Sequence, residues 1–585
     1  MGKKLSVPVL CVEESIAGFE SRRQKLLEAT AGPHVTEEAI RDVNQDIYGG
    51  RAIANLVLGK FVTACNVRLR RTAAWFDYPH PNGRHHKGEC DFAAIKLSRA
   101  WYLFDGTDRL EPETVTAIRQ FFLTTEFESR HHSENHELLF RTSRYLMAKV
   151  FEDDVFAAYG KTGTELAVED ADWLLHFIRY RARRGWGEFD SSCYFIPDWE
   201  CLVSLFDDCG DGSGEADREI HHLSEQMLNV LLVDMAVDSL NGMYGGAHGR
   251  IYPPHALDHI NCGTYALQHL YFGTVDPETM IGRGALIDAL ISKFRPDPLV
   301  VDIALNRPEK YVNRERKHLH NCSDVRPVVP VEGSIRKYTY YTPKYILGSL
   351  VAQDEYPADC SGAWYAHHEQ HEWDLTIGSR TKARIFTHHP GEAAPEHGYW
   401  TGDIRCCCGQ FFQHQTASMA LYDIPEKQPL QFIHAYVPKM AFDEVVDENG
   451  FVFVREGDVF AALKMLGGHV WTTQGEWADV EVISRGAKNG AVCEVGEKAD
   501  FGSFEAFRQE IAGNKMVFDA ETMSLTYQSK RAGKLMMDKQ GVRRLNDVDV
   551  DLNWPLYDCP YLQSEWDSGV ITVVKNGQKR VFDFT

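Results

Sequence analysis

The chain has 585 residues, of which 44% are hydrophobic and 25% are charged, a composition typical of a globular protein that is too long for one core. Its formal net charge of −22 disfavours nucleic acids and acidic membranes as general partners, because the summed field repels polyanions. The sequence has no apolar run long enough for a membrane span and no convincing signal peptide, so it predicts a cytoplasmic protein.

Residues 1–325 are predicted to form a helical domain. Apolar residues recur there at helical spacing, with short polar connections between the segments. The predicted helices include 37–65, 113–127, 166–183, 215–240 and 284–294. The proline-rich and valine-rich stretch 324–333 then changes the pattern and is the expected domain boundary.

Residues 334–585 are predicted to form a large antiparallel β-sandwich. Short extended runs, several alternating in period two, occur at 383–387, 416–422, 430–437, 451–454, 480–483 and 570–574. Asn-Gly pairs at 449–450, 489–490 and 576–577 lie between such runs, as tight hairpin turns require. The whole chain is therefore expected to be a multidomain α + β protein.

The first candidate site is the start of a helix near residue 134. Ser133 is the predicted N-cap, and an apolar stripe follows from Leu138. Asn135 and His136 then lie in the first turn, where the helix dipole favours an anion such as a carboxylate. The alternative is a polar helix end with ordinary capping.

The Asn135-His136 pair, followed by the stretch from Gly187-Glu188 to Tyr194, resembles the heparinase II/III-like polysaccharide lyases and their alginate-lyase relatives. In those families an (α/α) toroid carries an Asn-His pair, with a tyrosine somewhat under sixty residues later. Here Tyr194 follows His136 by 58 positions. The resemblance implies a helical (α/α) toroid before the β-sandwich. This sequence departs at Asp190-Ser191, where the families more often have Gly and Pro.

The resemblance implies β-elimination next to a uronic acid, in a cleft between toroid and sandwich. The C5 proton of a uronate becomes acidic enough only when its carboxylate is neutralised, and Asn135 and His136 could do this. Tyr194 could carry a proton as acid or base. The arginines at 179–184, including Arg183, could attract the uronate beside Glu188 and lower the phenol pKa. Alternatively they form a solvated helix end.

A second cluster follows the helix predicted at 215–240. Tyr244, His248, Arg250 and Tyr252 alternate with glycines, which let the backbone approach a ligand closely. These residues are candidates for a sugar-binding rim. A glycine-rich turn with ordinary surface aromatics would explain the same pattern.

A third cluster opens the β half and is rich in histidine. The related lyases often hold a metal in the sandwich, with a catalytic histidine close by. The resemblance thus implies His368 as the active-site histidine, Tyr399 as a second phenol, and a zinc ion, or another divalent metal, held by His371, His389 and His414. The run of cysteines at 406–408 is an alternative zinc site, or a strand with small buried residues.

The function predicted is a polysaccharide or oligosaccharide lyase acting on a uronate-containing glycan. A glycoside hydrolase is the first alternative, with a carboxylate pair from Glu134, Glu188 and Asp190. A carbohydrate-binding protein without catalysis is the second. Association into a homo-oligomer stays open. The sequence contains no phosphate-binding loop, dinucleotide fingerprint or Gly-x-Ser-x-Gly motif.

Overall fold

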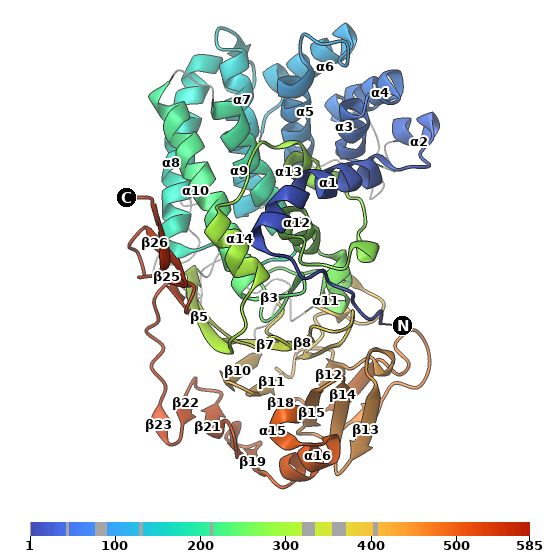
Figure 1. Cartoon of the computed structure of the whole chain (residues 1–585), viewed down its shortest axis with the longest axis vertical. Helices are drawn as coiled ribbons and strands as arrows, with labels where there is room; N and C mark the ends of the chain where they lie inside the picture. Colours follow the sequence, from blue (N-terminus) through green and yellow to red (C-terminus); the bar gives the residue numbers. More distant parts are fainter. Residues whose placement is uncertain are drawn as a thin grey trace.

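The structure is a computed structural model of the chain. It describes residues 2–42, 46–75, 90–127, 133–210, 214–318, 334–353, 370–401 and 408–585. Helices form the N-terminal half and lie above a β-rich C-terminal region (Figure 1). None of the helices in these ranges is both long enough and apolar enough to cross a bilayer.

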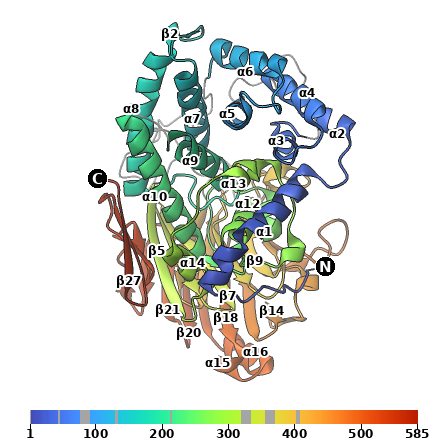
Figure 2. The ribbon, with the colours of Figure 1, turned by 45° about the horizontal axis from the view of Figure 1, so that its top comes forward.

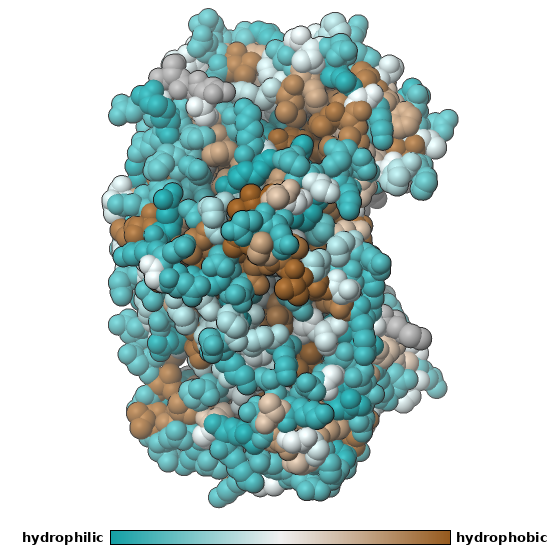
Figure 3. Space-filling view, in the orientation of Figure 1, coloured by the Kyte–Doolittle hydropathy of each residue, from teal (hydrophilic) through white to brown (hydrophobic). Residues whose placement is uncertain are grey.

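The N-terminal half is helical, as predicted. Its helices are α1 (Val12–Ala31), α2 (Glu37–Arg41), α3 (Gly50–Val57), α4 (Val62–Ala73), α5 (Asp91–Phe104), α6 (Pro112–Thr124), α7 (Glu134–Val150), α8 (Gly163–Arg184), α9 (Phe195–Cys209), α10 (Glu215–Val237), α11 (Pro253–Leu257), α12 (Gly263–Phe272), α13 (Ile287–Ile291) and α14 (Pro298–Leu305). The helices α2 to α8 follow an arc, with α9, α12 and α13 toward its inner side (Figure 2). On the face in Figure 3, apolar residues are concentrated over this half.

The single helix predicted at 37–65 is wrong, because three helices occupy this stretch. Gly49, at the start of α3, has φ 90°, and Phe61, at the start of α4, has φ 50°. Both values belong to the left-handed region, which an α-helix cannot include. The segment predicted at 166–183 is confirmed as α8, whose capping box at Thr162 and Glu165 extends it to Gly163.

The described part of the C-terminal half contains two large antiparallel sheets. The twelve-stranded sheet has the order β16-β17-β12-β9-β8-β7-β6-β5-β24-β25-β26-β27, and the six-stranded sheet the order β10-β11-β18-β15-β14-β13. Apolar side chains from both sheets form one core, for example Leu347 and Leu375 against Val454 and Ala461. The predicted β-sandwich is therefore present.

The strands of the large sheet are β5 (Tyr311–His318), β6 (Ser334–Tyr341), β7 (Tyr345–Gln353), β8 (Trp373–Ile377), β9 (Arg384–His388), β12 (Phe432–Tyr436), β16 (Val470–Trp471), β17 (Glu481–Arg485), β24 (Tyr557–Asp558), β25 (Leu562–Ser564), β26 (Val570–Lys575) and β27 (Gln578–Asp583). Those of the six-stranded sheet are β10 (Gly409–His414), β11 (Ala417–Asp423), β13 (Glu444–Glu448), β14 (Phe451–Glu456), β15 (Val459–Met465) and β18 (Lys488–Glu497). A five-stranded sheet follows, with β19 (Lys515–Asp519), β20 (Ser524–Ser529), β21 (Gly533–Asp538), β22 (Arg543–Leu545) and β23 (Val548–Asp549).

The large sheet begins before the predicted boundary. Strand β5 precedes residue 325 yet pairs along its whole length with β6. The C-terminal strands β24 to β27 then return to the free side of β5 and lie beside α8 and α10 (Figure 1). The helical and β halves are thus joined along a continuous sheet, and the predicted boundary segment 324–333 lies outside the described residues.

Candidate functional site

The start of α7 and the loop before α9 meet at one carboxylate. Asn135, in the first turn of α7, donates through Nδ2 to Glu188 Oε2 at 2.6 Å. Arg250 donates through Nη1 to the other oxygen, Glu188 Oε1, also at 2.6 Å. Asn135 is 0% exposed. Its amide therefore holds a carboxylate of the chain itself, in the way that it was expected to hold a uronate.

Glu134 fixes the loop that carries Glu188. Its carboxylate accepts hydrogen bonds from the backbone N–H groups of Gly187 at 3.1 Å and Glu188 at 2.5 Å. Arg181, from the last turn of α8, places Nε 3.0 Å from Glu134 Oε2. The predicted helix start at Ser133 is confirmed. Glu134, the first residue of α7, connects this helix with α8 and with the loop that carries Glu188.

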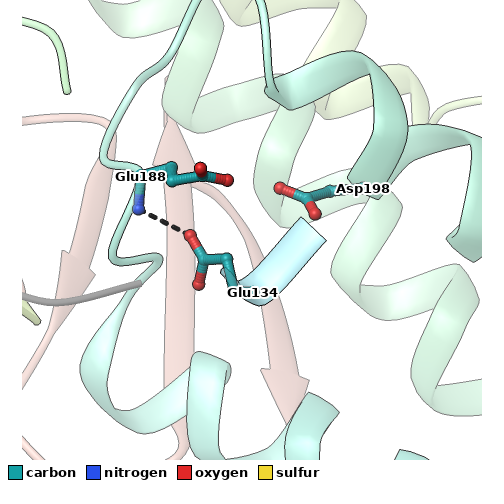
Figure 4. Close-up of side chains that lie close together, drawn as sticks. All are labelled: Glu134, Glu188 and Asp198. Carbon is teal, nitrogen blue, oxygen red and sulfur yellow. Dashed lines mark hydrogen bonds between the residues drawn. The ribbon is translucent and has the colours of Figure 1, made fainter. Parts of the chain in front are cut away.

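A third carboxylate, Asp198 of α9, points toward Glu134 and Glu188 (Figure 4). Burial raises the pKa of Glu134 to about 7, and burial and the other two carboxylates raise the pKa of Asp198 well above its ordinary value. Oxygens of all three lie close enough to hold a cation. Arg181 and Arg250 already face two of these carboxylates, and burial beside the other two disfavours the ionised form of Asp198. The donor set therefore suits a metal ion poorly.

Tyr194 is joined to Tyr252 by a hydrogen bond between the two hydroxyl groups. The guanidinium of Arg250 lies over the Tyr194 ring, with Cζ 3.8 Å from the ring centroid. Burial raises the pKa of Tyr194 well above its ordinary value, although Arg250 opposes this. The arginines at 179–184 were expected to lower this pKa; instead, the guanidinium that lowers it belongs to Arg250, and burial outweighs this effect.

Tyr194 lines a cavity of about 270 Å³. The cavity also contains titratable groups from distant segments: Asp46, Tyr48, Lys96, Cys193, Glu200, His255 and Arg283. All of its lining residues lie between Asp46 and Leu286. The described cavity is thus lined by residues of the helical half, whereas the sequence predicted a cleft between the two halves.

His136 lies beside this cavity and is paired with Asp91, the first residue of α5. The His136 Nδ1 atom is 2.5 Å from Asp91 Oδ2. Phe92, which lines the cavity, meets the His136 ring edge-on at 5.5 Å. Burial raises the pKa of Asp91, and the imidazole opposes that shift. The carboxylate orients the ring.

Asp190 anchors the loop between Glu188 and Tyr194 to the large sheet. Its carboxylate forms ion pairs with Lys317 of β5 and Lys337 of β6, and all three side chains are buried. Burial raises the pKa of Asp190, but the two ammonium groups outweigh it and hold this pKa below its ordinary value. Asp190 has φ 53°, a conformation that Asp tolerates better than most residues. The loop is therefore fixed from both halves of the molecule.

None of the six predicted substrate-binding residues lines the cavity. Arg250 and Tyr252 contact Tyr194, and Glu188 is bonded to Arg250, whereas the other three lie elsewhere. Tyr244 is buried with its ring 5.7 Å from the ammonium of Lys337. His248 is also buried; its Nδ1 is 2.7 Å from the backbone oxygen of Asp190, and burial lowers its pKa to about 3. Arg183 lies against Gly569, on the side of the C-terminal strands. In the described residues, Tyr244, His248 and Arg183 therefore do not form the predicted sugar-binding rim.

The three predicted metal ligands do not come together. His371 Nε2 is 3.2 Å from Arg384 Nη2, and His389 Nε2 is 2.9 Å from the backbone oxygen of Leu430. His414 lines a separate cavity on the β half. Across the described ranges, groups of three ligand atoms within reach of one ion consist of carboxylates alone. The sequence could not reveal that β9 and β10 belong to different sheets. Zinc binding stays a prediction.

Tyr399 packs next to α11, in one apolar cluster with Ile251 and Ala256. Its hydroxyl donates to Glu481 at 2.5 Å, and its ring packs against His434, with the centroids 4.7 Å apart. Burial is the main reason why the pKa of Tyr399 rises above its ordinary value, so at neutral pH its hydroxyl is an uncharged donor. The predicted catalytic His368, like Cys406 and Cys407, lies outside the described residues.

Sequence reasoning missed several residues that build the site, chiefly Asp91, Asp198 and Lys317. Nothing in the local pattern around Asp91 or Asp198 marks them, since each reads as an ordinary acidic residue in the first turn of a helix. A signal does exist for Lys317. It shares one face of β5 with Glu315 and Asn313, so this face is polar although the strand is central.

No protein-family model matches the chain, and no curated protein matches it. Among solved structures, the chain is similar to the Streptomyces coelicolor A3 chondroitin AC lyase in complex with chondroitin sulphate, with 9% identity, a TM-score of 0.26, and coverage of 97% of this chain and 89% of that chain. It is also similar to a tyrosine-to-alanine mutant of the lyase, with 9% identity, a TM-score of 0.25, and coverage of 90% and 83%. Similarities this low do not bear on the activity of the chain.

Proposed function

We propose that the chain is a polysaccharide or oligosaccharide lyase that cleaves a glycosidic bond next to a uronic acid by β-elimination. The observation that carries the proposal is the phenol of Tyr194, which lines a cavity, shares a hydrogen bond with Tyr252 and lies under Arg250. The resemblance of the Asn135-His136 pair and Tyr194 to the heparinase II/III-like lyases supports the same reaction.

In this reaction a base removes the C5 proton, a double bond forms between C4 and C5, and the oxygen on C4 leaves with a proton. Tyr194 is neutral at physiological pH because its pKa is raised, so it suits the role of the acid that protonates the leaving oxygen. Tyr252 is within hydrogen-bond reach and relays a proton to or from Tyr194. The two phenols act as one unit.

The uronate carboxylate must be neutralised as the C5 proton leaves. We assign this role to His136, whose ring is oriented by Asp91 beside the cavity, assisted by the guanidinium of Arg283 at the cavity wall. Asn135 acts differently. Because its side chain is fully buried and its amide is bonded to Glu188, it is a positioning residue that holds Glu188 and, through it, Arg250.

The proposal also includes the finer features that the resemblance implies. These are closure of the N-terminal helices into an (α/α) toroid, a zinc ion in the sandwich, and participation of His368 and Tyr399 at the active site. A uronate-containing oligosaccharide is the expected substrate.

A glycoside hydrolase is less well supported. Its acid and base would need two carboxylates that face the substrate. Glu134 and Glu188 are instead engaged by Arg181 and Arg250, and Asp190 is engaged by two lysines. None of these three carboxylates lines the cavity of Tyr194.

The test is to incubate the full chain with a panel of uronate-containing oligosaccharides and to follow ultraviolet absorbance and product masses. A lyase gives an absorbing, unsaturated uronate, and the two product masses sum to the substrate mass. A hydrolase gives no new absorbance and adds one water. Hydrolysis of any member of the panel would overturn the proposal, and binding without turnover would favour the carbohydrate-binding alternative.

A further inference from the structure

A larger cavity lies on the β half, away from Tyr194. Its volume is about 620 Å³, within the range of roughly 300–1,000 Å³ that is usual for small-molecule sites. One wall is the face of β5, β6 and β7, and the opposite wall is the segment 545–563, which leads from β22 back to the large sheet. No residue lines both this cavity and that of Tyr194.

The floor of this cavity is apolar and aromatic. Val312, Val351 and Phe412 lie beside the rings of Tyr338 and Trp554, which are buried. Both rings are held in place: Trp554 Nε1 donates to the backbone oxygen of Asp551 at 2.7 Å, and the hydroxyl of Tyr338 accepts from the backbone N–H of Gln415 at 3.1 Å. A rigid aromatic floor suits a flat ligand face made of C–H groups.

The rim is polar and net negative. Arg314, Asp549, Asp551, Asp558 and Gln563 line it, and most of them are exposed. Arg314 forms an ion pair with Asp558, and Asp549 forms one with Arg544 at 2.6 Å. With these two ion pairs formed, the carboxylate of Asp551 leaves the rim net negative, which disfavours a uronate. The carboxylates of the rim can accept hydrogen bonds from hydroxyl groups.

Two further lining groups have unused hydrogen-bonding capacity. Gln413 is 2% exposed, and its Oε1 atom is buried without a hydrogen-bond partner in the described ranges. A buried acceptor of this kind costs free energy unless something donates to it. The neighbouring imidazole of His414 is half-buried and has no hydrogen bond to the described part of the chain.

We propose that this cavity binds a neutral oligosaccharide. A pyranose ring has a C–H face that packs on aromatic rings and a rim of hydroxyl groups that bond to carboxylates, amides and imidazoles. The floor of Tyr338 and Trp554 and the polar rim offer these two features. The net negative rim excludes the anionic sugars that we assign to the cavity of Tyr194, so the two cavities would bind different glycans. The inference does not depend on the lyase proposal.

The test is calorimetric titration of the full chain with neutral tetrasaccharides of glucose, mannose and galactose, and with a uronate tetrasaccharide. At least one neutral tetrasaccharide should bind with a stoichiometry of one. Gln563→Ala and His414→Ala should each weaken that binding by roughly fivefold or more, the scale of one hydrogen bond. Gln578→Ala, an exposed glutamine of β27 outside the cavity, is the matched control and should change nothing.

Three results would overturn the inference. They are the absence of binding by every neutral tetrasaccharide, binding that neither Gln563→Ala nor His414→Ala weakens, and equal binding of the uronate tetrasaccharide at this cavity. Tyr194→Phe separates the two sites, since it should leave neutral-sugar binding unchanged. Binding that is lost in Tyr194→Phe and kept in Gln563→Ala would move the ligand to the other cavity.

Discussion

Replacing Asp190 by Asn tests the anchor that joins the two halves at the site. The change keeps the shape of the side chain and tolerates φ 53°, but it removes the charge that pairs with Lys317 and Lys337. Losing one partner of a buried ion pair typically costs about 3–5 kcal/mol because the other charge is left unpaired. Here each lysine keeps other carboxylates, among them Asp234 at 2.8 Å from Lys317 and Asp238 at 2.6 Å from Lys337. We therefore expect a smaller loss, about 1.5–3 kcal/mol, as for hydrogen bonds to charged groups.

Asp234→Asn is the matched control. Burial, with Glu315 and Asp190 close by, raises the pKa of Asp234 well above its ordinary value despite Lys317, whereas the two lysines hold the pKa of Asp190 below its ordinary value. Asp234 therefore gains less from its ionised form than Asp190 does, and Asp234→Asn should cost less than Asp190→Asn, about 1 kcal/mol. Urea unfolding at neutral pH, monitored by fluorescence and circular dichroism, measures both variants. If Asp234→Asn costs as much as Asp190→Asn, this assignment of charges is refuted.

Three further predictions follow from the site. Burial raises the pKa of Glu134 to about 7, so folding takes up a proton at this carboxylate. The free energy of unfolding should therefore fall as the pH rises from about 5 to about 8. In urea titrations, Glu134→Gln should make this dependence on pH weaker. Arg250→Lys, which replaces the planar group over Tyr194, should lower kcat by roughly tenfold to a hundredfold, whereas Arg183→Lys should change it less than about twofold; equal losses would contradict the geometry. If elemental analysis finds zinc in the purified protein, His414→Ala should retain it, and loss of zinc would make His414 a ligand after all.

Much of the fold follows from local patterns in the sequence. Helical spacing predicted α8 and α10 to within a few residues, and period-two alternation predicted β9, β11 and β26. The Asn-Gly pairs at 449–450 and 576–577 are hairpin turns with positive φ at both residues, as expected.

The prediction of a turn at the Asn-Gly pair 489–490 is wrong, because this pair lies inside β18. The packing of the strand explains why glycine occurs there. A Cβ at Gly490 would lie 2.4 Å from the backbone oxygen of Ala420 on the neighbouring strand β11. Glycine is required there by close approach of two strands. Asn489 accepts through Oδ1 from the backbone N–H of Gly467, so its side chain ties down a neighbouring turn.

The candidate site could be predicted only in part. The start of α7 and the residues Asn135 and His136 were found from capping and resemblance, because these signals are local. Their partners Glu188 and Asp91 are distant in sequence, and only the packing of α5, α7 and α9 determines which carboxylate meets which donor. The pKa of Tyr194 was expected to fall, because the neighbouring arginines are visible in the sequence. The burial that instead raises this pKa depends on the fold and cannot be seen in the sequence.

The most direct test of the central claim is the rate of ultraviolet absorbance increase with a uronate oligosaccharide, measured for the wild type and Tyr194→Phe, with the melting temperature taken on the same preparations. The account predicts an unsaturated product from the wild type and a rate lower by roughly a hundredfold to ten-thousandfold in Tyr194→Phe, with KM changed much less. The ring and its contact with Arg250 remain, so the melting temperature should change little. A variant that melts lower but turns over at the wild-type rate would contradict the account and make Tyr194 a structural residue.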